Sequence, residues 1–79
     1  MPLYLINIYN DADILDEEGS DFPDLGAAKD VAIRGARAMM AEHIIAGRPV
    51  NMRHRIEVTE QSGRVLAVIP FGEIITIIE

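Results

Sequence analysis

Two short segments of the chain, residues 3–8 and 65–71, present apolar side chains on both faces if they form β-strands. Residues 3–9 are rich in β-branched and aromatic side chains, which favours a strand. The pattern predicts only one long helix, and one helix covers only one face of a small sheet. The other face then has to meet water, the C-terminal tail or a second molecule.

The helix is predicted over residues 24–46. Asp24 is a good N-cap because its carboxylate accepts amide protons of the first turn. Gly47 suits the left-handed position after the last turn, and Pro49 prevents continuation. The apolar side of this helix consists mostly of small residues, and we expect Gly35 on that side to allow close approach of a neighbouring element. The residues on this side are Leu25, Ala28, Val31, Ala32, Gly35, Ala36 and Met39.

Strands are predicted on both sides of the helix. Asparagine and aspartate at 10–13 indicate a turn after the first strand, and a weak returning arm is expected to begin at Ile14–Leu15. Residues 52–60 alternate between apolar and charged positions, as a half-exposed strand does. A loop with Gly63 follows, and residues 64–71 form the returning strand. For the tail, 73–79, a strand and a helical turn both remain open.

The predicted fold class is therefore α+β, in the order ββαββ. We expect a single domain over residues 1–79, with an antiparallel four-stranded sheet and the helix packed on one face. The pattern does not determine the order of the strands in the sheet.

Composition limits the setting of this domain. A chain of 79 residues has a marginal core, and the absence of cysteine excludes disulfides and thiolate metal sites. No apolar run approaches the length that crosses a bilayer, and the first residues lack the features of a signal peptide. We therefore expect a cytoplasmic protein with no membrane contact.

Charge is unevenly distributed along the chain. The net charge is −6, and the stretch 11–24 carries seven acidic residues and no basic one. An acidic patch of this kind recognises a basic partner or simply forms a solvated loop that keeps the protein soluble. The solvated loop is the favoured interpretation.

The motifs of known chemistry are missing. A calcium loop starting at Asp11 needs an oxygen ligand at its fifth position, glycine at its sixth and glutamate at its twelfth, where this chain has Leu15, Asp16 and Phe22. His43 and His54 have no metal-binding spacing, and no serine lies in a nucleophile elbow. We predict no catalytic residue, no metal site and no cofactor, and we expect that the protein is not an enzyme.

Basic residues around the second hairpin suggest an alternative. A strip of arginines there could contact nucleic acid, because Arg53 and Arg55 point the same way on the predicted strand. The acidic pI of about 4.7 and the absence of interleaved aromatics argue against it, so nucleic-acid binding is disfavoured. The candidate contacts are Arg48, Arg53, Arg55 and Arg64.

A series of short motifs runs through the chain in a fixed order. An acidic D-E-E-G turn at 16–19 precedes a P-D-L helix start at 23–25, the helix ends in G-R-P at 47–49, and G-R-V-L at 63–66 leads to P-F at 70–71. In this order and spacing the chain resembles the small proteobacterial proteins grouped as domain of unknown function 6894. The resemblance implies a bacterial cytosolic setting and assigns no activity, ligand or catalytic residue.

Our leading hypothesis follows from the uncovered sheet face. The chain is expected to act as a non-enzymatic association module through protein–protein contacts and to form a homodimer, since exposed aliphatic patches of this kind mark interfaces. The alternative is a small nucleic-acid-linked regulator that uses the Arg53/Arg55 hairpin. The predicted interface residues are Leu3, Leu5, Leu66, Val68, Ile75 and Ile77.

Overall fold

The computed structural model describes residues 2–10 and 13–78 and has an α+β fold. Its elements are β1 (Leu3–Tyr9), β2 (Ser20–Asp21), α1 (Leu25–Ile45), β3 (Arg55–Glu60), β4 (Val65–Pro70) and α2 (Phe71–Ile74). The predicted ββαββ order is confirmed, and α2 is added after it. Asp11, where the rejected calcium loop would start, and Glu79, the last residue of the tail, lie outside the described residues.

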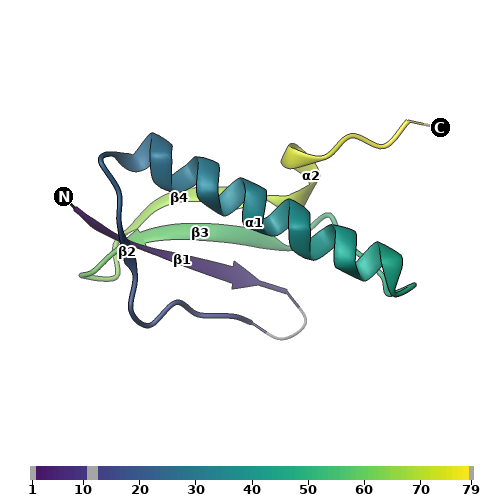
Figure 1. Cartoon of the computed structure of the whole chain (residues 1–79), viewed down its shortest axis with the longest axis horizontal. Helices are drawn as coiled ribbons and strands as arrows, with labels where there is room; N and C mark the ends of the chain where they lie inside the picture. Colours follow the sequence, from purple (N-terminus) through teal and green to yellow (C-terminus); the bar gives the residue numbers. More distant parts are fainter. Residues whose placement is uncertain (1, 11–12, 79) are drawn as a thin grey trace.

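The four strands form one antiparallel sheet in the order β2-β1-β3-β4 (Figure 1). β1 pairs with β3 along nearly its whole length, from Tyr4 opposite Glu60 to Tyr9 opposite Arg55. β3 pairs with β4, with a bulge where the register shifts between Val58 and Thr59. β2 and β4 therefore form the two edges of the sheet.

α1 begins and ends where its capping residues predict. The Asp24 carboxylate accepts a hydrogen bond from the Ala27 amide at 2.8 Å. At the other end Gly47 has a φ of +73°, and the Arg48 amide donates to the carbonyl of His43 at 2.8 Å. This glycine-terminated turn satisfies carbonyls that the end of the helix leaves without an intrahelical partner.

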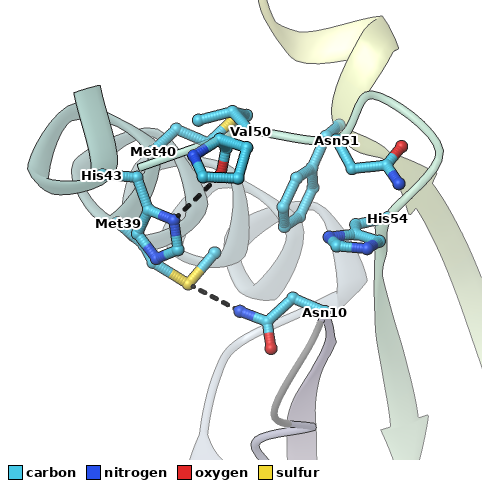
Figure 2. A pocket seen from close by; sticks show the side chains of 9 residues that line it. Asn10, Met39, Met40, His43, Val50, Asn51 and His54 are labelled. Atoms are coloured by element: carbon cyan, nitrogen blue, oxygen red, sulfur yellow. Dashed lines mark hydrogen bonds between the residues drawn. The ribbon is translucent and has the colours of Figure 1, made fainter. Parts of the chain in front are cut away.

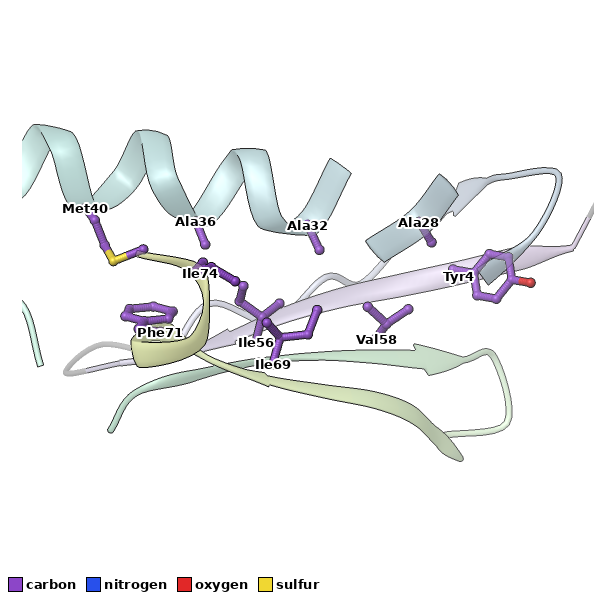
Figure 3. Packing of buried hydrophobic residues seen from close by; sticks show 10 residues of the cluster. All are labelled: Tyr4, Ala28, Ala32, Ala36, Met40, Ile56, Val58, Ile69, Phe71 and Ile74. Carbon is purple, nitrogen blue, oxygen red and sulfur yellow. The ribbon is translucent and has the colours of Figure 1, made fainter. Parts of the chain in front are cut away.

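The core lies between α1 and one face of the sheet (Figure 3). α1 contributes a row of residues at four-residue spacing, and the small alanines let the helix approach the strands closely. β3 contributes Ile56 and Val58, whose side chains are fully buried. The helical side of this core consists of Ala28, Ala32, Ala36 and Met40.

The predicted apolar side of the helix was partly wrong. Val31 is 42% exposed, and a Cβ added to Gly35 would meet nothing within 4 Å. Both residues lie one position before the buried row of Ala32 and Ala36, on the flank of the helix. Gly35 therefore allows no close approach, contrary to the expectation from the sequence.

The tail adopts neither of its two predicted conformations as a whole. α2 forms a short turn in which Phe71 and Ile74 are buried in the core, Ile75 has an extended backbone, and residues 75–78 lie in no helix or strand. Arg37 of α1 donates through Nε to the carbonyl of Ile74 at 2.9 Å. The tail consequently leaves the body on the helix side of the sheet (Figure 1).

The returning arm of the first hairpin was predicted in part, since Ile14 pairs antiparallel with Ile8 but Leu15 does not extend the pairing. The strand forms at Ser20–Asp21, whereas Ile14 makes only an isolated bridge to Ile8, with two hydrogen bonds of 2.8 Å. Between them the side chain of Asp16 bonds to the backbone of β1 in place of a strand, as described below. No helix in the described part of the chain is long and apolar enough to cross a membrane.

Candidate functional site

The loop between β1 and β2 covers the outer edge of β1. Between the Ile8–Ile14 bridge and β2, the Ile6 amide points outward and donates to the Asp16 carboxylate at 3.1 Å. The same carboxylate accepts from the Gly19 amide at 2.9 Å, and the Asp16 amide donates to the Asn7 side chain at 2.9 Å. A carboxylate thus replaces a strand carbonyl, so within the described residues β1 itself presents no free ladder to another chain.

The same loop covers part of the face that α1 leaves open. Gly19 has a φ of +74°, and a Cβ added to it would lie 2.9 Å from Cδ2 of Leu5 and 3.1 Å from Cγ of Leu3. These two predicted interface residues are therefore half-buried under their own chain. This cover was missed from the sequence, although the D-E-E-G motif contains both residues that create it.

The β4 side of the sheet is different. Within the described residues β4 pairs only with β3, and its outer edge has no strand beside it. Val68 is 52% exposed and Val65 is 45% exposed. The segment Val65–Pro70 carries no charged side chain. Two of its features, the bulge at Leu66 and the proline at its end, are of the kind that limits pairing of an edge strand with another chain.

The six predicted interface residues do not form one patch. Val68 lies on the helix-free face, in the row that continues through Glu57 to Asn7. Ile75 packs against the core, and Ile77 is exposed on the tail beyond α2. Leu66 is half-buried against the core at the bulge. Of the six, Val68 and Leu66 lie at the open edge, and the sequence did not single out their neighbour Val65.

The basic strip is not a continuous cationic surface. Arg55 donates through Nε to Glu57 at 2.8 Å, and its guanidinium carbon lies 4.3 Å from the centre of the Tyr9 ring. The hydrogen bond to Glu57 raises the pKa of Arg55, and the adjacent carboxylate offsets the positive charge at this position. Arg53 lies in the turn before β3, and Arg48 and Arg64 are exposed outside the strands.

The two histidines line one small notch between the C-terminal part of α1 and the start of β3 (Figure 2). His43 Nδ1 lies 3.3 Å from the carbonyl of Pro49, and Asn10 donates to the sulfur of Met39 at 3.4 Å. His54 contacts the ring of Phe71 edge-on, with the ring centres 6.0 Å apart. The notch has about 10 Å³ of free volume, which is room for about one water molecule and no organic substrate.

Other sites of chemistry are not favoured by the geometry. Among residues 2–10 and 13–78 no group of three or more histidines and carboxylates is arranged to hold a metal ion. A shallow depression of about 380 Å³ is lined by residues of α1 alone, Asp30, Ile33, Arg34 and Arg37. One helix face without a facing element does not enclose a ligand on several sides, as binding pockets do.

The comparisons place the chain in a family without assigning an activity. The model of a domain of unknown function, DUF6894, matches residues 3–72, and the chain belongs to this family. The match ends inside α2 and includes both hairpins and the long helix. No curated protein and no solved structure matches the chain.

Proposed function

We propose that this domain is a non-enzymatic association module that forms a homodimer through the β4 side of its sheet. The supporting observation is the contrast between the two edges. The β1 edge is covered by β2, the Ile8–Ile14 bridge and Asp16, while the β4 edge carries half-exposed valines and no charge. Exposed aliphatic side chains on an uncharged strand edge favour pairing with another chain.

The proposed association is weak to moderate. Fully burying a valine contributes about 1.5–3 kcal/mol, so covering the exposed halves of Val65 and Val68 contributes roughly 1 kcal/mol for each side chain. The edge is shorter than a standard interface of about 800 Å² per partner, and association itself costs several kcal/mol. The homodimer therefore depends on protein concentration.

A cytoplasmic location belongs to the same proposal. The chain has no cysteine, so its stability does not depend on an oxidising compartment. The net charge of −6 keeps the monomer soluble while the open edge is unpaired.

Analytical ultracentrifugation over protein concentrations from about 10 µM to about 1 mM tests the proposal. At about 1 mM a dimer with a millimolar dissociation constant is substantially populated. The average mass should rise with concentration. Val68→Lys, which places a charge on the open edge, should abolish this rise. Val31→Lys is the matched control because Val31 is a comparably exposed valine on α1 and should leave the mass profile unchanged. A wild-type protein that remains monomeric up to about 1 mM contradicts the proposal.

A further inference from the structure

The notch between the C-terminal part of α1 and the start of β3 is lined by a thioether and an imidazole from one face of the helix. Met39 and His43 are four positions apart on α1, so their side chains are neighbours on successive turns. Both are half-buried, and both line the notch (Figure 2). The spacing of the two histidines predicts no metal site, but a methionine at this spacing supplies a second kind of donor.

The hydrogen bond of His43 determines which of its ring nitrogens can bind a cation. Nδ1 lies 3.3 Å from the carbonyl oxygen of Pro49, which can only accept, so Nδ1 carries the proton of the neutral ring. Nε2 then keeps its lone pair, and Figure 2 shows it on the side of the ring toward Met39. Metal-binding histidines are held in the same way, with the other ring nitrogen donating to a carbonyl or carboxylate.

The sulfur of Met39 is directed into the notch. It accepts a hydrogen bond from Nδ2 of Asn10, just after β1, at 3.4 Å. A thioether sulfur is a weak hydrogen-bond acceptor, so this contact yields readily to a metal ion. The helix therefore presents one sulfur and one nitrogen lone pair to the same small space.

The donors and the size of the notch select one kind of cation. The free volume of about 10 Å³ is about that of one water molecule, so a single ion fits. Among the described residues that line the notch, none is a carboxylate, a lysine or an arginine, so a hard cation finds no anionic ligand and no side-chain cation repels a metal. Protein-bound Zn²⁺ takes thiolate, imidazole and carboxylate ligands, whereas a thioether favours Cu(I).

We propose that Sδ of Met39 and Nε2 of His43 bind one Cu(I) ion in this notch. Two neutral donors are sufficient, because Cu(I) takes two ligands in a nearly linear arrangement. The net charge of −6 on the chain favours the approach of a cation. His54 is not a ligand in this arrangement, since its ring packs edge-on against Phe71 with the ring centres 6.0 Å apart. The site lies away from β4 and does not depend on the proposed homodimer.

Ag(I) tests the site, because it shares the preference of Cu(I) for soft donors and has no redox chemistry in water. Titration of the wild-type chain with silver nitrate in chloride-free buffer should reveal one saturable site per chain. The NMR signal of the Met39 methyl group should shift during the titration. Cu(I), kept reduced by ascorbate, should displace the bound silver.

Two matched pairs of variants locate the ligands. Met39→Leu should weaken Ag(I) binding at least about tenfold, whereas Met52→Leu, at another half-buried methionine, should leave it unchanged. His43→Gln should weaken binding by a similar factor, whereas His54→Gln, in the same notch, should not. These substitutions nearly conserve side-chain volume, and far-UV circular dichroism checks that each variant is folded.

Several results would overturn the proposal. A wild-type chain with no saturable Ag(I) site would do so, as would equal affinities of Met39→Leu and Met52→Leu. A loss in His54→Gln equal to that in His43→Gln would indicate a site formed by the two histidines and overturn the assigned ligands. Silver that Cu(I) does not displace, or that equimolar Zn²⁺ displaces, would overturn the choice of Cu(I).

Discussion

The carboxylate of Asp16 is predicted to be a principal support of the β1 edge, and Asp16→Ala removes it. In the native chain it accepts amides from Ile6 at 3.1 Å, Gly19 at 2.9 Å and Glu18 at 3.3 Å. A hydrogen bond to a charged group contributes about 1.5–3 kcal/mol net, and a buried donor left without a partner costs a similar amount. The turn amides of Glu18 and Gly19 can be hydrated, so most of the loss arises at Ile6.

We therefore expect Asp16→Ala to lower the free energy of unfolding by about 2–4 kcal/mol. A domain of 79 residues has a total stability of roughly 4–12 kcal/mol, so the loss is a large fraction. The midpoint of thermal unfolding should fall by roughly 10–25 °C. Asp16→Asn keeps one acceptor oxygen and should show about half of the effect.

Urea unfolding followed by far-UV circular dichroism measures this change, because the chain has no tryptophan. Glu17→Ala is the matched control, since Glu17 is the exposed neighbour in the same acidic turn and its substitution should cost no more than about 0.5 kcal/mol. Equal stabilities of Asp16→Ala and Glu17→Ala would refute the role of Asp16 and indicate that the turn acts only through its charge.

Three further expectations concern other parts of the chain. Gly19→Ala should destabilise the domain by roughly 2–3 kcal/mol, because Gly19 has a positive φ and the added Cβ meets Leu5 and a backbone carbonyl. In the same urea assay Gly35→Ala should stabilise the domain by about 0.5–1 kcal/mol, because the added Cβ meets nothing. A stabilising Gly19→Ala or a destabilising Gly35→Ala would contradict the described packing of the loop or of the helix. Asp24→Ala should cost about 0.5–2 kcal/mol and reduce helical ellipticity at intermediate urea concentrations, and no change would argue against the cap. Duplex DNA at about 50 mM salt should not retain the protein, and retention that Arg53→Ala and Arg55→Ala abolish would favour the nucleic-acid alternative.

Local signals explain the parts of the fold that the sequence predicted well. The helix boundaries depend on Asp24 and Gly47, whose capping roles act within a few residues of each position. The second hairpin depends on Gly63, which adopts a φ of +95° in the loop, and on the alternation that buries Ile56 and Val58. These features require no knowledge of distant contacts.

The cover of the sheet could not be predicted in the same way. Asp16 reaches Ile6 across ten positions, and nothing in the pattern of the acidic turn distinguishes this contact from a solvated carboxylate. Gly35 was expected to pack closely because it was assigned to the buried side of the helix, whereas the buried row runs through its neighbour Ala36. The tail was ambiguous because its isoleucines favour a strand by propensity, while Phe71 and Ile74 gain burial in the core by forming a turn.

The candidate surface was predicted in outline only. An uncovered apolar face was the expectation, and on β4 Val65 and Val68 are exposed. Leu3 and Leu5 were assigned to the same surface because the sequence does not show which strand lies at an edge or where the first loop folds. The position of a strand in the sheet and the loop that packs over it depend on contacts between distant residues. These contacts decide which strand keeps an unpaired edge.

Sedimentation equilibrium of the wild-type chain beside Val68→Lys tests the central claim most directly. The wild-type mass should rise from 8.7 kDa toward twice that value as the concentration increases, while the folded variant stays at the monomer mass throughout. Identical concentration dependence of the two proteins would contradict association through the β4 side of the sheet.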